Sequence, residues 1–316
     1  MTASVEPVSV ERLLKDARLA SLELRVMAGE AGIDRLITNP RLQKPGLALA
    51  GFLDCVKPGR VQIIGASETA FLRTLGADLE AERVARLIAM EPPLVMIAKD
   101  LSTAVRAFAT PCQRAGVPLV VSSATTSVLI ERFAATLEFL LAPRAVMHGD
   151  LLDVFAIGVL LVGDSGSGKS ECALELVHRG HRLVADDVVE VFRLRTAELI
   201  GQSPEQVRGL MEVRGLGLIS IEQLFGVVSV RDSKPVDLVI KLVTDPTVPL
   251  ERLGLAESTT TILDIQRPEL TVPVAPGRNL ALLVECAARK YLLTQRGVVD
   301  AAREYLLRHD RDLAGT

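Results

Sequence analysis

The sequence predicts an α/β protein with two domains, and three observations support this prediction. The chain has 316 residues, more than one domain usually holds. In its first half, short apolar segments alternate with helical patterns, which is typical of a parallel sheet covered by helices. In its second half, short strands surround a glycine-rich segment that follows a strand and precedes a helix. We expect a small N-terminal parallel α/β domain over 1–130 and a mixed α/β domain over 131–316.

Turn residues separate the elements of the first half. Ser9 is a suitable N-cap for a helix that continues to about Leu19, and Ser67 opens another helix. Pro92-Pro93 ends a helix over 81–90. Further helices are predicted over 102–115 and 126–141, with strands at 61–65, 94–98 and 119–121. This half contains no residue pattern typical of catalysis.

The second half is richer in strands. Its glycine-rich segment is followed by a good helix-forming stretch that starts at Glu171. Two more helices are predicted near the C-terminus, and Asn279 is a suitable N-cap for the first of them. The predicted strands are 145–148, 153–162, 181–185, 188–194 and 236–243, and the predicted C-terminal helices are 279–296 and 298–309.

Composition excludes several classes of protein. A net charge of -3 disfavours a general nucleic-acid binder. The longest apolar stretch, 151–162, is too short to span a membrane and contains Asp153. No signal peptide is visible between Met1 and Glu11, and the four cysteines form no C-x-x-C pair. We expect a cytoplasmic protein with reduced thiols that binds neither a membrane nor nucleic acid.

The segment that best predicts function matches the phosphate-binding pattern G-x-x-x-x-G-K-[ST]. A buried strand precedes it and a helix follows it, as the pattern requires. Its glycines let several N–H groups face one anion, and the helix N-terminus adds a partial positive charge. The lysine can reach the outer phosphates and the last serine can face Mg²⁺. The segment consists of Gly163, Asp164, Ser165, Gly166, Ser167, Gly168, Lys169 and Ser170.

Acidic side chains follow this phosphate loop. Asp186-Asp187 comes after an apolar strand, where carboxylates can hold Mg²⁺ or accept a proton from an attacking hydroxyl. The dipeptide alone is equally compatible with a solvated turn. Glu212 can supply a metal ligand from a glycine-containing segment that is otherwise compatible with an ordinary turn. His148 precedes the strand that feeds the loop, although a lone histidine is more often structural.

Two later segments carry basic residues. Arg252 stands in Leu250–Leu255, where a single arginine is usually only solvated. Pro273–Arg278 places Arg278 beside a helix N-terminus, which is a combination suited to an anion. A rigid proline-glycine lead-in to the helix explains this second segment equally well.

Taken in order, these segments resemble one family, the bacterial HPr kinase/phosphorylases. The resemblance covers roughly 145–296 and includes Met147-His148-Gly149 with the phosphate loop, Leu183–Asp187, Met211–Ile219, Arg252–Leu255 and Pro273–Arg278. It implies a C-terminal kinase domain of the phosphoenolpyruvate carboxykinase type. The first half is similar to the family's other domain only in length and α/β pattern.

The resemblance also implies an activity. Such an enzyme phosphorylates a serine of HPr, the phosphocarrier of the sugar phosphotransferase system, from ATP or pyrophosphate, and removes that phosphate with inorganic phosphate. It implies a homohexamer and a Mg²⁺ cofactor held by Ser170 and Glu212. By the same resemblance the catalytic residues are His148, Lys169, Asp187 and Arg252, the loop Gly163–Ser170 binds the nucleotide, and Pro273–Arg278 serves the reverse reaction.

Three positions depart from the family pattern, namely Ser167 in place of a commoner Val, Ser220 in place of a usual Asn, and Ala275. Ala275 stands where the family usually has a basic residue, which predicts weaker phosphorolysis than phosphorylation. Two alternatives belong to other classes, namely a nucleotide-sensing regulatory protein without transfer activity and a small-molecule kinase on a related phosphate-loop fold. Asp187 argues against the first, because a sensor needs no base, and Met211–Ile219 argues against the second.

Overall fold

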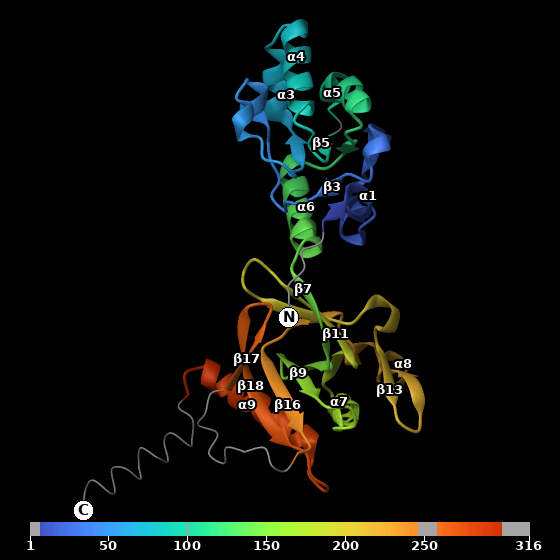
Figure 1. The fold of residues 1–316 in the computed structure, drawn as a ribbon. Coiled ribbons are helices and arrows are strands. Elements are labelled where there is room, and N and C mark those ends of the chain that lie inside the picture. Colours follow the sequence, from blue (N-terminus) through green and yellow to red (C-terminus); the bar gives the residue numbers. More distant parts are fainter. Residues whose placement is uncertain (1–6, 100, 246–257, 299–316) are drawn as a thin grey trace, which may run out of the picture. The chain divides into compact units, whose positions relative to one another are not determined.

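A computed structural model describes residues 7–99, 101–245 and 258–298 (Figure 1). Contacts between residues divide the chain into two compact units that part between Ala142 and Pro143. The division expected near residue 130 lies inside a helix, α6 (Thr126–Leu140). That helix packs its apolar side chains on the first unit, so the first unit extends to the helix end.

The first unit is built on a four-stranded sheet with the order β2-β6-β5-β4. β4 (Gln62–Ile64), β5 (Val95–Ala98) and β6 (Leu119–Ser122) are parallel, as the sequence predicted. The edge strand β2 (Arg25–Ala28) is antiparallel to β6 and was not predicted. The sheet is therefore mixed at one edge.

Helices cover both faces of this sheet. On one face α6 packs Leu129, Phe133 and Leu137 against alternate strand residues. On the other face α4 (Ala77–Ile88) and α5 (Ser102–Ala115) pack against the remaining strand residues. The unit is completed by α1 (Val10–Leu14), α2 (Gly46–Leu49), α3 (Ala66–Arg73) and the short pair β1 (Val8–Ser9) and β3 (Leu36–Ile37).

In the second unit the main sheet has six strands in the order β10-β8-β9-β16-β18-β17. β16 is parallel to β9 and to β18, whereas the other neighbours are antiparallel. The strands are β8 (Asp150–Val154), β9 (Ile157–Gly163), β10 (Arg182–Ala185), β16 (Leu238–Val243), β17 (Ser258–Ile262) and β18 (Ile265–Pro273).

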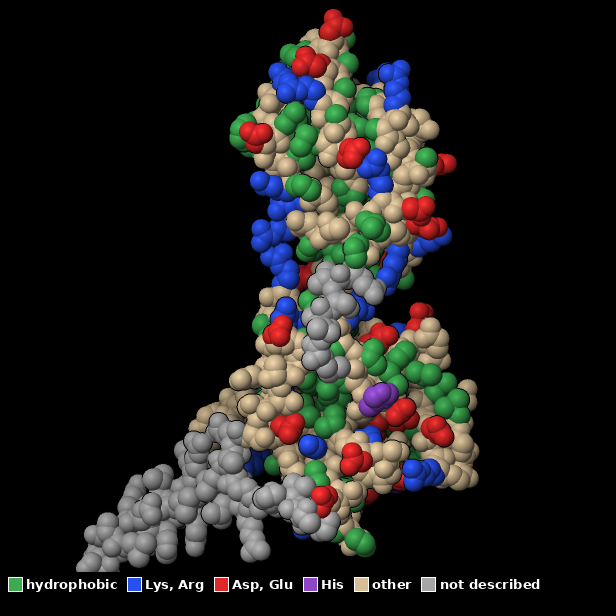
Figure 2. Space-filling model, viewed as in Figure 1, with side chains coloured by type: hydrophobic (Ala, Val, Ile, Leu, Met, Phe, Trp, Pro, Cys, Tyr) green, Lys and Arg blue, Asp and Glu red, His purple; other side chains and the backbone are tan. Residues whose placement is uncertain are grey.

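A smaller antiparallel sheet has the order β15-β12-β11-β7. It contains β7 (Arg144–His148), β11 (Val188–Arg193), β12 (Leu199–Gln202) and β15 (Ser233–Pro235). A separate hairpin pairs β13 (Leu210–Val213) with β14 (Gly217–Ser220), and α8 (Ile221–Phe225) follows it. On the visible face of this unit, acidic and basic side chains are interspersed (Figure 2).

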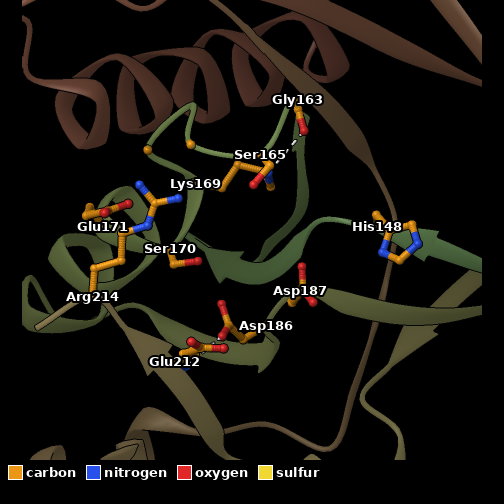
Figure 3. A pocket seen from close by; sticks show the side chains of 12 residues that line it. His148, Gly163, Ser165, Lys169, Ser170, Glu171, Asp186, Asp187, Glu212 and Arg214 are labelled. Atoms are coloured by element: carbon orange, nitrogen blue, oxygen red, sulfur yellow. Dashed lines mark hydrogen bonds between the residues drawn. The ribbon is translucent and has the colours of Figure 1, made fainter. Parts of the chain in front are cut away.

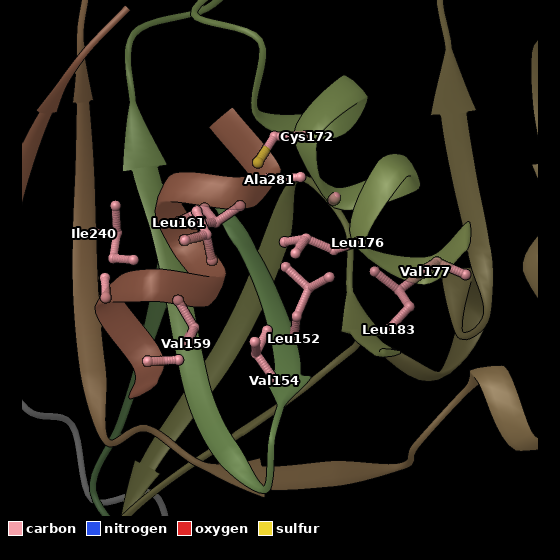
Figure 4. Close-up of a cluster of buried hydrophobic side chains, with 14 of the residues drawn as sticks. Leu152, Val154, Val159, Leu161, Cys172, Leu176, Val177, Leu183, Ile240 and Ala281 are labelled. Carbon is pink, nitrogen blue, oxygen red and sulfur yellow. The ribbon is translucent and has the colours of Figure 1, made fainter. Parts of the chain in front are cut away.

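The side chains on the two faces of the six-stranded sheet belong to two separate hydrophobic cores. On one face, α7 (Lys169–His178) and α9 (Leu280–Gln295) cover residues such as Leu152, Leu161 and Ile240 (Figure 4). On the other face, Leu151 and Leu160 belong to a second core that includes residues of the four-stranded sheet. Strand β9, which feeds the phosphate loop, is thus buried on both faces and gives the loop a rigid base.

One expectation for this unit needs correction. The predicted strand 153–162 is two strands, because Phe155 and Ala156 form a tight turn with φ of 51° and 68° between β8 and β9. The segment that contains Glu212 forms a β-hairpin, in which Glu212 lies on the first strand. The second predicted C-terminal helix lies outside the described residues except for Val298.

Candidate functional site

The phosphate loop connects β9 to α7, as the sequence predicted. Gly163, Gly166 and Gly168 have φ of 154°, 82° and 84°, which an L side chain rarely adopts. A Cβ on Gly163 would also lie 2.5 Å from the carbonyl oxygen of Leu242. The amine of Lys169 donates hydrogen bonds to the carbonyls of Gly163 and Asp164 at 3.0 and 3.1 Å. The loop conformation therefore depends on its glycines, and the Lys169 side chain links the end of the loop to its beginning.

A pocket of about 470 Å³ opens over the loop and α7 (Figure 3). The side chains around it come from five places in the second unit. They are the loop itself, the start of α7, the end of β7, the turn between β10 and β11, and the β13–β14 hairpin. The residues that line it and carry a charged or polar side chain are His148, Ser165, Lys169, Ser170, Glu171, Asp186, Asp187, Glu212 and Arg214.

The two aspartates lie in the turn between β10 and β11 and have different environments. Asp186 is half-buried, and its Oδ2 accepts a hydrogen bond from the main-chain N–H of Glu212 at 3.0 Å. Asp187 is exposed toward the pocket and has a φ of 60°. Its carbonyl accepts from the N–H of Gly149 at 2.9 Å. Asp187 is thus the more accessible carboxylate, with its main chain fixed from the neighbouring turn.

A third carboxyl group lies beneath them. Asp150, the first residue of β8, has no exposed surface, and its Oδ1 accepts from the main-chain N–H of Asp187 at 3.0 Å. Burial, followed by the nearby charge of Asp186, raises the pKa of Asp150 to about 7. Burial also raises the pKa of Asp186, although its hydrogen bond with the Glu212 N–H opposes that effect. The two carboxyl groups therefore cannot both ionise readily at neutral pH.

The hairpin supplies the remaining side of the pocket. Glu212 lies on β13, and Arg214 follows in the turn. Atoms of the Arg214 guanidinium lie 3.7 and 3.9 Å from the position that a Cβ on Gly166 would take. The hairpin therefore brings a cation next to the phosphate loop and a carboxylate next to the aspartate turn.

Ser170 and Glu212 fit a magnesium ion as oxygen ligands. Mg²⁺ prefers hard oxygen donors, keeps several waters, and is usually held by one or two protein groups together with phosphates. Both side chains line the same pocket as Lys169. Among the described residues no cluster of three or more His, Cys, Asp or Glu suits a metal ion. The pocket thus offers a site suited to a metal that arrives with a phosphate ligand.

Replacement of Asp150 by Asn should change the pH dependence of stability. Asp150 has a usual pKa of 3.8, raised in the fold to about 7, so folding favours its protonated form. Stability from this group is full below pH 4 and is lost as pH rises through 7. Asn does not titrate. The free energy of unfolding of Asp150→Asn minus that of the wild type should therefore be about 3 kcal/mol larger at pH 8 than at pH 5. Denaturant unfolding at both pH values measures this difference, and an unchanged difference would contradict the prediction.

Comparisons with known proteins agree along nearly the whole chain. Residues 8–137 match the model described as HPr Serine kinase N terminus, and residues 140–309 match the HPr Serine kinase C-terminal domain. The HPr kinase/phosphorylase of Geobacter sulfurreducens is 42% identical over 308 residues, which is 97% of this chain and 95% of that protein. The chain belongs to the HPr kinase/phosphorylase family.

Two further proteins are similar to this chain. The HPr kinase/phosphorylase of Bacillus cytotoxicus is 41% identical over 288 residues, which is 91% of this chain and 93% of that protein. A solved structure of the Hpr(Ser) kinase/phosphatase from Coxiella burnetii is 36% identical and covers 51% of this chain and 98% of that chain, with a TM-score of 0.46. The two matched segments of the HPr kinase/phosphorylase family correspond to the two compact units.

The fold brings most of the predicted site residues together. His148, Lys169, Ser170, Asp187 and Glu212 line one pocket, although they come from four separate segments. Ser167 is different, since its side chain is buried and its hydroxyl oxygen has no hydrogen-bond partner among the described residues. Arg252 lies outside the described residues.

The Pro273–Arg278 segment follows β18 and leads into α9. Asn279 caps this helix, as predicted, by accepting a hydrogen bond from the N–H of Leu282 at 2.8 Å. A Cβ on Gly168 would lie 3.5 Å from the side chain of Leu280, so the start of α9 is beside the phosphate loop. The guanidinium of Arg278 donates to the carbonyl of Pro273 at 3.3 Å.

One residue of the site was missed by sequence reasoning. Asp150 follows His148-Gly149 and could have drawn attention as an acid directly before the apolar pair Leu151-Leu152. Its burial depends on other segments of the chain, including strand β9, where Leu161 is the residue paired with Asp150. Of the four free thiols, those of Cys112 and Cys172 are buried, whereas that of Cys286 is exposed. No described helix is long and apolar enough to cross a membrane.

Proposed function

We propose that this chain transfers the terminal phosphoryl group of ATP, or a phosphoryl group of pyrophosphate, to a serine of HPr, and that it also returns that group to inorganic phosphate. The observation that carries the proposal is the placement of Asp187 in the same pocket as Lys169 and Ser170. A phosphate loop alone binds a nucleotide, whereas a carboxylate facing it can accept a proton from a hydroxyl nucleophile. The kinase/phosphorylase names of the relatives support both directions of transfer.

In the forward direction Asp187 accepts the serine proton as the serine oxygen attacks the phosphorus. The loop N–H groups and Lys169 hold the phosphates in line with the attacking oxygen. Charge on the transferring group is stabilised by the Lys169 ammonium, with the guanidinium of Arg252 proposed as a second cation. His148 borders the same pocket and is proposed to contact the reacting phosphate.

The reverse direction uses the same groups in the opposite order. Protonated Asp187 gives its proton to the serine oxygen as inorganic phosphate attacks the phosphoserine and pyrophosphate forms. Ser170 and Glu212 are the proposed ligands of Mg²⁺, which when bound neutralises phosphate charge. The Pro273–Arg278 segment is proposed to serve this direction, because Arg278 precedes a helix whose start lies beside the loop.

Three finer statements belong to the same proposal. The second unit is proposed to have a phosphoenolpyruvate carboxykinase type of phosphate-loop fold, on the strength of its β9–loop–α7 connection inside a mixed sheet. The protein is proposed to be a homohexamer in the cytoplasm. It is proposed to bind neither nucleic acid nor a membrane, and its net charge of -3 supports this.

The decisive experiment is a transfer assay with purified protein, MgATP or magnesium pyrophosphate, and an HPr protein. We expect phosphate on one HPr serine, detected by mass spectrometry, and its removal when inorganic phosphate replaces the donor. An HPr in which that serine is Ala is the matched control. Tight ATP binding without transfer would favour the nucleotide sensor, and transfer to a small molecule alone would favour the small-molecule kinase.

Ala275→Lys should speed the reverse reaction. Ala275 lies in the Pro273–Arg278 segment, and a lysine there adds a cation close to the start of α9 and the phosphate loop. We expect phosphorolysis to rise by about 3- to 10-fold, which corresponds to about 1 kcal/mol of added stabilisation, with phosphorylation little changed. Rates of pyrophosphate formation and of HPr phosphorylation at saturating substrates measure this. Wild-type phosphorolysis that already equals phosphorylation at saturating phosphate would remove the basis of the prediction.

A further inference from the structure

Asp150 is a buried carboxyl group for which the proposed reaction has no role so far. It opens β8 and has 0% exposed surface, and the next two residues of the strand, Leu151 and Leu152, are apolar. Burying a carboxyl group is costly unless it is hydrogen-bonded. Its Oδ1 has one partner, the main-chain N–H of Asp187, at 3.0 Å. The hydrogen bond that offsets the cost of burying Asp150 therefore comes from the main chain of Asp187, the proposed base.

The other oxygen of Asp150 faces a second aspartate. Oδ2 of Asp150 and Oδ1 of Asp186 are both buried without a hydrogen bond of good geometry among the described residues, and the Ser170 hydroxyl is the other side-chain donor close to the Asp186 carboxyl. The two carboxyl groups are nevertheless close enough to hydrogen-bond with each other. One proton on Asp150 satisfies both orphaned oxygens, because Oδ2–H then donates to Asp186. This arrangement leaves no buried carboxyl oxygen without a partner in the pair.

We propose that Asp150 is a positioning residue that, in its protonated form, holds Asp187 through the main-chain N–H and Asp186 through a hydrogen bond between the two carboxyl groups. It would thereby fix the direction in which the Asp187 carboxylate enters the pocket. The proposal deepens the proposed function, since it assigns a role to Asp150 in the same transfer reaction.

The backbone of Asp187 needs such support. Its φ of 60° is uncommon for a residue other than glycine, although Asp adopts it more readily than most, so the surroundings help to hold it. Two contacts enforce it, and both come from the turn between β7 and β8. Gly149 donates its N–H to the carbonyl of Asp187 at 2.9 Å, and Asp150 accepts from the N–H. This turn begins at His148, which pairs with Val188 next to Asp187. The turn therefore places His148 and Asp187 relative to each other.

The charges around Asp150 favour its protonated form. The charge of Asp186 disfavours a negative charge on Asp150, whereas the main-chain N–H of Asp187 and the charge of Lys169 at the start of α7 act in the opposite sense. Burial is the largest cause and raises the pKa of Asp150 to about 7. Asn has the same shape as protonated Asp, can accept at Oδ1, and can donate from Nδ2 to Asp186. Ala has neither group.

This difference gives a sharp test with three variants, Asp150→Ala, Asp150→Asn and Asp153→Ala. Asp153 is a matched control because it is a second carboxyl on β8, only 8% exposed, and is paired with Arg231 at 2.7 Å and Lys234 at 3.4 Å instead of with the site. The readouts are kcat and KM for transfer to HPr in both directions, and hydrogen exchange of the Asp187 amide by mass spectrometry of the 183–190 segment.

We expect Asp150→Ala to lower kcat by about 10- to 100-fold in both directions, with KM for ATP within about 2-fold, because a misdirected base impairs the chemical step. The Asp187 amide should lose protection from exchange. Asp150→Asn should restore kcat to within about 3-fold of wild type, and should restore the protection. Asp153→Ala should lower Tm while leaving kcat, assayed below Tm, and Asp187 exchange unchanged.

Two results would overturn the inference. If Asp150→Asn is as slow as Asp150→Ala, the negative charge is needed and the group does not act as a neutral hydrogen-bonding partner. If Asp150→Ala leaves both kcat and exchange unchanged, Asp150 does not position Asp187. Absence of transfer by the wild type would instead refute the proposed function, and the exchange measurement would still decide whether Asp150 holds the Asp187 main chain.

Discussion

Asp187→Asn is expected to lower the rate of phosphoryl transfer to HPr by about 10²- to 10⁴-fold in both directions, which is the usual contribution of a general acid–base group. An amide cannot accept the serine proton in the forward reaction, and it cannot supply one to the leaving serine oxygen in reverse. The change is nearly isosteric, and the main chain of Asp187 keeps its partners Gly149 and Asp150. We therefore expect unchanged Tm and unchanged affinity for MgATP, measured by calorimetry beside the transfer assay.

A matched control for this variant is Asp264→Asn. Asp264 is also an aspartate with positive φ in a strand-connecting turn, at 64°, but its side chain is 79% exposed and pairs with Arg193. We expect this variant to keep full transfer activity. If Asp187→Asn retained more than about a tenth of the wild-type rate, Asp187 would not be the proton acceptor.

The parts of the site that sequence reasoning predicted are those encoded locally. The phosphate loop needs glycines at positions of positive φ, a lysine and a following helix, and all of these are contiguous between Gly163 and Ser170. The buried strand before it and the N-cap at Asn279 are local as well. Such features depend on backbone conformations that only a few residue types favour, so the residue types reveal them.

The parts that were missed depend on contacts between distant segments. The turn that divides 153–162 is formed by Phe155 and Ala156, neither of which is a usual turn residue, so an uninterrupted apolar run looked like one strand. The antiparallel edge strand β2 pairs with β6, about a hundred residues later in the chain. The role of Asp150 depends on a hydrogen bond to Asp187 across 37 positions. Nothing within a local window distinguishes such an aspartate from one in a solvated turn.

Family membership and pocket geometry support the assignment of this pocket as a phosphoryl-transfer site in different ways. The family accounts for the order of motifs along the chain. The geometry adds that the β13–β14 hairpin brings Glu212 and Arg214 over the phosphate loop, and that the N–H of Glu212 is tied to Asp186. The metal-binding candidate and the aspartate turn are thus mechanically linked by a main-chain hydrogen bond, so a movement of the hairpin would also displace Asp186.

Lys169→Ala is expected to have the second large effect, lowering transfer by about 10²- to 10³-fold, the usual loss for one group that stabilises developing charge. Unlike Asp187→Asn, it should also weaken binding of ATP and pyrophosphate, because the ammonium interacts with the bound phosphates as well as with the transition state. The Lys169 amine also donates to the carbonyls of Gly163 and Asp164, so its removal loosens the start of the loop. Lys15→Ala is the control, since Lys15 is 75% exposed and pairs with Glu11 in the first unit.

The two variants together separate transfer from binding. If the pocket performs phosphoryl transfer, Asp187→Asn keeps nucleotide affinity and loses turnover, whereas Lys169→Ala loses both. If the pocket only senses nucleotide, Asp187→Asn leaves every measurable property of the protein near wild type, because a sensor has no proton to transfer, and only Lys169→Ala has an effect. Isothermal titration with MgATP and single-turnover transfer to HPr, performed on the same preparations, distinguish these patterns. The position of one carboxylate, rather than the phosphate loop, is therefore what makes this pocket a candidate for catalysis.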